Sequence, residues 1–141
     1  MRRLLWSVVV AMLLGVVTRP AVAQRSSDRP VISLEEPRPN PVLPAALVPF
    51  AIDAEVCRKD HIPRVSVKVY NVLANPVAAL RLRGRRTTPL DNSPLRCGAY
   101  VAVWDGTIDG GTRVAPPGIY YLQLAVDDRA PRTRKLIVTQ P

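Results

Sequence analysis

The chain has 141 residues and carries 20 lysine and arginine residues against 11 aspartate and glutamate residues, a formal net charge of +9. Its 15 prolines outnumber its 7 glycines and are spread along the sequence, so few windows are long enough for a helix and an all-β protein is favoured. The positive charge keeps a protein soluble and favours anionic partners. The low aromatic content of 5% argues against a surface that stacks nucleic-acid bases, so no nucleic-acid partner is expected.

The first 23 residues have the order of a secretory signal peptide. Arg2 and Arg3 precede a nearly continuous apolar run over residues 4–17, and the small residues of 21–23 follow, so cleavage is expected after Ala23. A retained membrane anchor is the alternative, but an apolar helix of about 14 residues spans only about 21 Å of the roughly 30 Å hydrocarbon layer. We therefore expect an exported protein, periplasmic or extracellular, with no transmembrane segment after cleavage.

The two cysteines, Cys57 and Cys97, are predicted to form a disulfide, because an even number of thiols in an exported chain favours a bridge. A metal site is the alternative, since His61 lies four residues after Cys57. Two thiols and one imidazole are one ligand short of a closed zinc site. In this alternative, a carboxylate such as that of Asp60 supplies the fourth ligand. The disulfide is favoured, and no metal or cofactor is expected.

Residues 24–30 are expected to be a flexible leader, and residues 31–141 a single domain of ordinary size. Apolar alternation and the turn signals between runs predict about seven short antiparallel strands, the pattern of an immunoglobulin-like β-sandwich. The predicted strands lie at 31–34, within the apolar stretch 47–56, and at 64–70, 77–82, 98–104, 119–126 and 133–139.

The clearest strand is 64–70, in which every second residue is valine, and it is expected to pair as a hairpin with 77–82. Both faces of 98–104 are apolar, which predicts a central strand. The stretch 83–96 is expected to cross between elements without packing much itself, and 105–112 is expected to be a turn region.

Several motifs follow one another in a fixed order along the domain. They are Pro39-Asn40-Pro41, then Val67-Lys68-Val69-Tyr70-Asn71-Val72-Leu73-Ala74, then Trp104-Asp105-Gly106, Asp109-Gly110-Gly111 and Gly118-Ile119-Tyr120. This series resembles the immunoglobulin-like domain of the flagellar hook-capping (FlgD-like) family, and is similar to bacterial C-terminal secretion-sorting domains. The resemblance implies a sandwich in which Trp104, Asp105, Gly106, Asp109, Gly118 and Tyr120 form turns and core. The family has glycine where this chain has Ala74, and the two cysteines are not general family features.

No set of residues indicates catalysis. His61 is the only histidine and has no evident nucleophile as a partner, and no serine lies in a nucleophile-elbow pattern. Asp105 and Asp109 share a glycine-containing loop and raise the alternative of a calcium site. Too few oxygen ligands are visible, so we favour Asp105 in a turn and Asp109 supporting nearby backbone amides. Trp104 is expected in the core rather than in a recognition patch, with Tyr121 opposite Tyr120 and partly exposed.

The densest basic cluster comprises Arg81, Arg83, Arg85 and Arg86. At alternate spacing the first three would line one strand face and continue into the following loop, where they could contact phosphate groups of an anionic envelope surface. A solvated face without a ligand is the favoured interpretation.

These observations predict a non-enzymatic, exported structural or adaptor module that binds another envelope or secreted protein through strand edges and loops. Two alternatives remain open. One is an envelope-binding module that uses the basic cluster for peripheral contact with an anionic surface, and the other is a stand-alone variant of a secretion-sorting domain.

Overall fold

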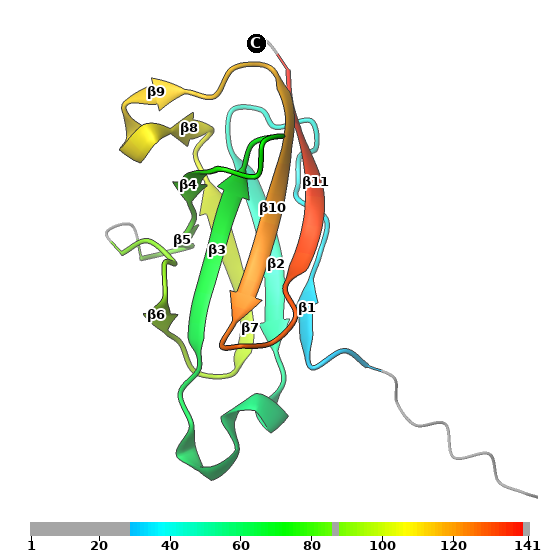
Figure 1. Ribbon diagram of the computed structural model, residues 1–141, viewed down its shortest axis with the longest axis vertical. Helices are drawn as coiled ribbons and strands as arrows, with labels where there is room; N and C mark the ends of the chain where they lie inside the picture. The colour runs from blue at the N-terminus through cyan, green and yellow to red at the C-terminus, as the bar shows by residue number, and fades with distance from the viewer. Residues whose placement is uncertain (1–28, 86–87, 140–141) are drawn as a thin grey trace, which may run out of the picture.

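Two antiparallel sheets packed face to face form the body of the described part of the chain, which confirms the predicted all-β sandwich (Figure 1). The computed structural model describes residues 29–85 and 88–139. The predicted signal peptide 1–23 and most of the predicted leader 24–30 lie outside these ranges. Within them, no helix is both long and apolar enough to cross a membrane.

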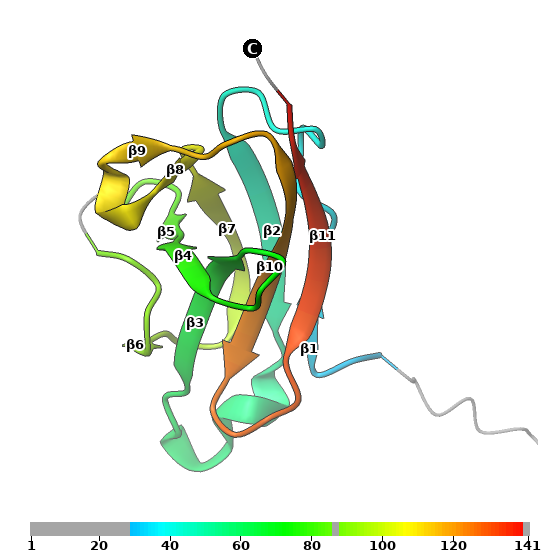
Figure 2. The ribbon, with the colours of Figure 1, turned by 45° about the horizontal axis from the view of Figure 1, so that its top comes forward.

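The first sheet, here the β2–β7 sheet, has the strand order β1-β2-β7-β5, and the second, the β3–β10 sheet, has the order β11-β10-β3-β4 with β6 also paired to β3. Figure 2 shows the β3–β10 sheet in front of the β2–β7 sheet. A small third sheet pairs β8 with β9. The bounds are β1 Ile32–Leu34, β2 Ala46–Ile52, β3 Arg64–Tyr70, β4 Pro76–Ala79, β5 Arg81–Leu82, β6 Ser93–Pro94, β7 Gly98–Trp104, β8 Thr107–Ile108, β9 Arg113–Val114, β10 Gly118–Val126 and β11 Arg132–Val138.

The core lies between the two sheets and is built from alternate residues of each long strand, because successive side chains of a strand point to opposite faces. β3 contributes Val65, Val67 and Val69, all fully buried. The facing layer and the neighbouring strands add Val48, Phe50, Ile52, Ala102, Leu122, Leu124 and Val126. β7 pairs with β2 on one side and β5 on the other, the central place predicted from its two apolar faces.

The expected hairpin partner 77–82 is not one strand. Its first part, β4, pairs with β3 as predicted, but β5 belongs to the other sheet and pairs with β7. Leu80 lies between the two parts, fully buried, and its backbone N–H donates to Val67 O at 2.8 Å. Burying this leucine carries the chain from one sheet to the other, a change that the sequence pattern does not reveal.

The predicted strand of the stretch 47–56 occupies its first part, whereas the stretch 83–96 differs from expectation. β2 ends at Ile52, because Asp53 Oδ1 accepts a hydrogen bond from Glu55 N at 2.9 Å and begins a short 3₁₀ segment, Ala54–Asp60. The stretch 83–96 does pack, since Leu90 and Leu95 are buried and β6 pairs with β3. Neither leucine has a local signal of burial, because both stand in a sequence otherwise rich in turn-forming and charged residues.

Candidate functional site

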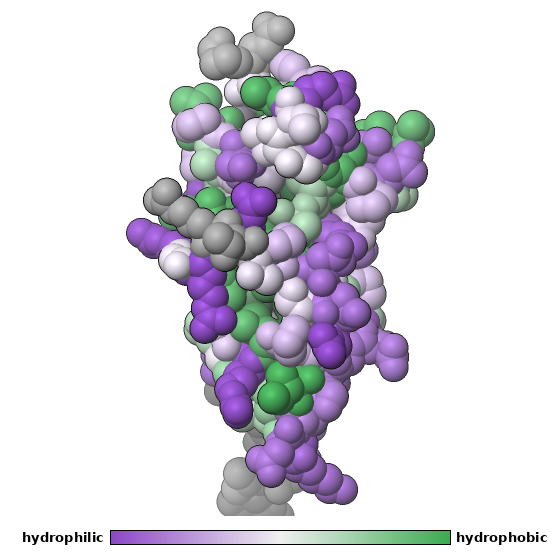
Figure 3. All heavy atoms as spheres, turned by 90° about the vertical axis from the view of Figure 1, so that its left-hand side faces the viewer, coloured by the Kyte–Doolittle hydropathy of each residue, from purple (hydrophilic) through white to green (hydrophobic). Residues whose placement is uncertain are grey.

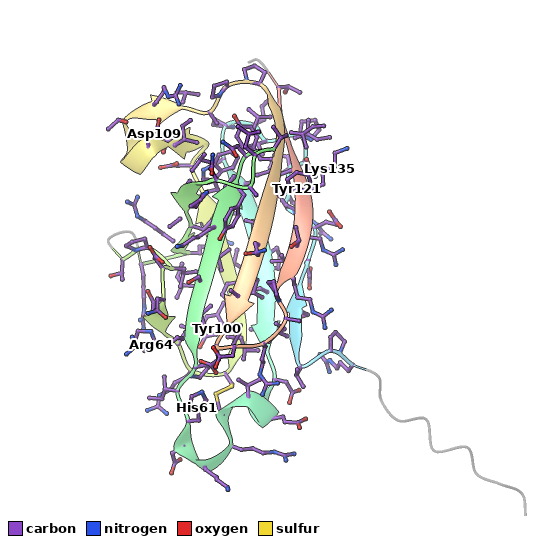
Figure 4. All side chains as sticks on the ribbon, in the orientation of Figure 1. His61, Arg64, Tyr100, Asp109, Tyr121 and Lys135 are labelled. Carbon is purple, nitrogen blue, oxygen red and sulfur yellow. A yellow bond between two sulfur atoms is a disulfide. The ribbon has the colours of Figure 1, made fainter. Side chains whose placement is uncertain are left out.

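A disulfide joins Cys57 to Cys97 across 40 positions of the chain, as predicted, with Cα atoms 6.1 Å apart. The bridge ties the 3₁₀ segment to the residue just before β7, at the end of the sandwich where His61 also lies (Figure 4). Both thiols are used in the bridge, so the alternative metal site with His61 is not formed. Within residues 29–85 and 88–139, no group of three or more His, Cys, Asp or Glu side chains is placed to hold a metal ion.

Trp104 and Tyr120 pack together at the opposite end, with ring centroids 6.0 Å apart and planes tilted by 55°. Each aromatic also makes one hydrogen bond to a nearby carbonyl. Trp104 Nε1 donates to Thr107 O at 2.8 Å, and the Tyr120 hydroxyl donates to Pro116 O at 2.7 Å. Both side chains are buried, so neither is part of an exposed recognition patch. The hydrogen bonds from Trp104 Nε1 and the Tyr120 hydroxyl instead hold in place the loop that follows β7 and the loop that precedes β10.

Asp105 and Gly106 shape the turn after β7. Asp105 Oδ1 accepts hydrogen bonds from Thr107 N at 2.9 Å and from Thr107 Oγ1 at 2.6 Å. Burial raises the pKa of Asp105, but the Thr107 hydrogen bonds and the Arg81 charge together hold it below its usual value. Gly106 has a φ of +79°, and a Cβ there would lie 2.5 Å from the Pro44 carbonyl oxygen. Only glycine fits this position, because both the conformation and the space exclude a side chain.

Among the described residues, no backbone N–H donates to the Asp109 carboxylate, so the prediction that it supports nearby amides was wrong. Its carboxylate pairs with Arg113, whose Nε and Nη2 lie 3.0 and 2.9 Å from Asp109 Oδ2, while its backbone carbonyl accepts from Thr112 Oγ1. The pair closes the β8–β9 hairpin. Gly118, which the resemblance also places among the motif residues, begins β10 with a φ of +156°. The carboxylates of Asp105 and Asp109 thus each hold their own short loop.

His61 has a partner that no sequence motif indicates. Its Nε2 lies 2.8 Å from Asp127 Oδ2, and Asp127 Oδ1 accepts from Arg64 N at 2.8 Å. Figure 4 shows His61 and Arg64 at the same end of the molecule. Ser66 lies on the same surface, but its hydroxyl accepts a hydrogen bond from Asn92 N at 2.7 Å, and the hydrogen bonds of the described residues do not join it to His61. Ser66 therefore pairs with Asn92, and His61 with Asp127.

The predicted arginine stripe is divided by the structure. Arg81 lies on β5 opposite Val103, but β5 has only two residues, so Arg83 and Arg85 follow in the turn instead of continuing a strand face. Arg83 and Arg85 are brought together with Arg96, from before β7, around a groove. Arg86, the fourth member of the predicted cluster, lies outside the described residues. Arg96 has no signal in the sequence, because it joins the others only through the fold.

Several segments with exposed apolar residues lie at the end of the sandwich where β11 finishes (Figure 1). Leu73, Val114, Val72 and Leu43 are 76%, 74%, 68% and 61% exposed. They come from the β3–β4 turn, from β9 and from the segment before β2. Ile119, at the start of β10, is also exposed. We call these five residues the end surface. In the sequence, Val72 and Leu73 are ordinary turn residues, since nothing in a linear pattern shows which loops share an end.

No family model, no curated protein and no solved structure matches this chain. The resemblance to the hook-capping family stays a prediction based on the ordered motifs. In the structure the central motif residues lie close together, with Trp104 and Tyr120 in the core and Asp105 and Gly106 in the adjoining turn.

The Asp127 contacts make acid sensitivity a testable property. Burial raises the pKa of Asp127, but hydrogen bonds from Arg64 N and His61 hold it below the ordinary 3.8. A carboxyl whose pKa is lower in the folded state stabilises the fold fully at a pH above its unfolded-state pKa. This stabilisation is lost as the pH falls through the folded-state pKa. We expect Asp127→Asn to lower the free energy of unfolding at neutral pH by about 1 kcal/mol, and by less near pH 3.

Asparagine tolerates the positive φ of 47° at this position, so the substitution mainly removes the charge. Asp128→Asn, at the exposed neighbouring residue, is the matched control and should change stability little. Urea unfolding of both variants across the pH range checks the prediction. Equal losses in the two variants would contradict it.

Proposed function

We propose that this chain is an exported, non-enzymatic module that acts by binding another envelope or secreted protein. The observation that carries the proposal is the end surface. Single exposed apolar residues are common on soluble proteins, but several large ones gathered at one end are typical of an interaction site. Four side chains more than half exposed come from three separate segments at the same end of the sandwich (Figure 1).

The loops that carry the end surface are held in place by hydrogen bonds. Asn71 Oδ1 accepts from both Leu73 N and Asn75 N at 3.0 Å, and this network holds Ala74 at a φ of 60°. The Asp109–Arg113 pair closes the hairpin that presents Val114. Loops that are already ordered lose less conformational entropy on binding, which favours their use as a contact surface.

The side-chain chemistry of the described residues supports a role without catalysis. His61 and Asp127 form a pair without a hydrogen-bonded nucleophile, and Asp105 and Asp109 are engaged within their own loops. We also propose that the sandwich is related to the hook-capping immunoglobulin-like domains. Support comes from the motif residues, since Trp104 is buried in the core and Gly106 has no room for a side chain.

Site-specific photo-crosslinking in cells that export the protein tests this function. A photoreactive residue in place of Leu73 should form an adduct with one partner protein, whereas the same group in place of Thr133, exposed on β11, should not. Adding Val114→Asp to the Leu73 probe should reduce the adduct about tenfold, because a charge would be buried on binding. Adducts of equal yield from both positions, or none from Leu73, would contradict the proposal.

A further inference from the structure

The edges of the two sheets are not equally protected. The outer edge of β11 is covered by the chain before β2, since Val42 N donates to Ile137 O at 2.8 Å and Ile137 N donates to Asn40 Oδ1 at 3.0 Å. On β1, the Leu34 carbonyl accepts from Arg134 Nε at 2.8 Å. Natural sheets protect edges in such ways, because an exposed edge offers its backbone groups to another chain.

β7 is covered along only half of its outer edge. β5 pairs with Val103 and Ala102, and Arg83 N donates to Val101 O at 2.8 Å. The chain then turns away, with Arg85 N donating to Leu82 O and Gly84 at a φ of +85°. Backbone groups of alternate residues point to alternate sides of a strand. The N–H and C=O of Ala99 and the N–H of Val101 therefore face this edge, and the hydrogen bonds of the described residues satisfy none of the three.

An apolar groove of about 490 Å³ adjoins this open half of the edge. It contains the side chains of Ile62, Leu82, Leu95, Tyr100 and Val101 together with Pro94, and Arg83, Arg85 and Arg96 also line it. Figure 3, which faces the β4–β6 side of the molecule, shows an apolar strip flanked by hydrophilic side chains.

The charge of the groove has one sign. It has three arginines and no carboxylate among its lining residues. The ion pairs of the described residues do not include Arg83, Arg85 or Arg96, whereas Arg113 and Arg134 both pair with a carboxylate. Guanidinium groups bind carboxylates by charge-assisted hydrogen bonds, so a partner with acidic side chains would complement this rim.

We propose that the open half of β7 accepts an extended segment of a partner protein, in which apolar and acidic residues alternate, as an added antiparallel strand. The segment would begin beyond Arg83, which already lies opposite Val101, and would exchange two hydrogen bonds with Ala99. Its residue opposite Tyr100 would place an apolar side chain in the groove. Its acidic residues would pair with the arginines that line the groove. This inference rests on the proposed binding function and adds a second, distinct contact.

A blocked peptide of about six alternating glutamate and valine residues, the usual length of a strand, is a suitable probe. Titrated into the processed protein, it should bind saturably and slow hydrogen exchange at the amide of Ala99. Arg85→Glu should weaken binding about tenfold, whereas Arg132→Glu, with the same charge change on β11, should leave it within about twofold. Unchanged unfolding midpoints for both variants establish that the fold is retained.

Four outcomes would overturn the inference. They are no binding of the peptide, equal binding of a lysine–valine peptide, unaltered exchange at the Ala99 amide, or equal effects of the two charge reversals. Retention on anionic phospholipid vesicles that depends on Arg85, without peptide binding, would instead assign the arginines to a membrane surface. The Leu73 crosslinking experiment is independent of β7, so the proposed function and this inference can fail separately.

Discussion

Reduction of the Cys57–Cys97 bridge is expected to lower the free energy of unfolding by about 4 kcal/mol. The bridge closes a loop of 40 positions, and in the chain-entropy model a loop of that size restricts the unfolded chain by this amount. A domain of this size has a total stability of about 5–15 kcal/mol, so the loss is a large share of it. The measurement is urea unfolding with and without a reductant.

The double variant Cys57→Ser, Cys97→Ser is the control, because it should unfold at the midpoint of the reduced protein and be insensitive to reductant. Loss of the bridge should also loosen the groove, since Cys97 immediately precedes β7 and its neighbour Arg96 lines the groove. A reduced protein as stable as the oxidised one would show that the bridge is not a structural staple.

Gly106→Ala is expected to be the most destabilising change in the loops, at about 2–5 kcal/mol. A left-handed conformation costs a residue with a side chain about 1–2 kcal/mol, and forcing a methyl group into occupied space adds about 1–3 kcal/mol. The new Cβ would lie 2.5 Å from Pro44 O, a backbone atom that cannot move without displacing the segment before β2.

Gly110→Ala separates the two contributions. Gly110 has nearly the same φ, +72°, but no atom lies within 4 Å of the position that a Cβ would take there, so only the conformational cost applies. Thermal or urea unfolding of the two variants should therefore differ by about 1–3 kcal/mol. Equal losses would mean that the contact between the β7–β8 turn and Pro44 does not restrict Gly106.

The fold was largely predictable because its long strands have strict alternation. The valines of β3 and the apolar residues of β10 mark one buried face each, so their positions followed from the sequence. The crossing of Leu80 between sheets was not predictable, because 77–82 has the same local pattern whether it stays in one sheet or changes to the other. The disulfide followed from the even cysteine count and the expected compartment.

The candidate surfaces were less predictable than the fold. The end surface includes Leu43, Val72, Leu73 and Val114, and the pairing of the strands next to them places their segments at one end. Arg96 joins Arg83 and Arg85 in the same way. The His61–Asp127 contact spans 66 positions and has no local signal. Loop residues are brought together by topology, which periodicity within a segment does not report.

The most direct test of a contact function is a calorimetric titration of the processed protein with the partner identified by crosslinking from Leu73. The wild-type protein and Thr133→Asp are expected to bind with the same affinity. A Val72→Asp, Leu73→Asp variant that keeps its unfolding midpoint should bind at least about a hundredfold more weakly, because two charges would be buried against the partner. Equal affinity of all three proteins would contradict the account that the end surface is where this module binds.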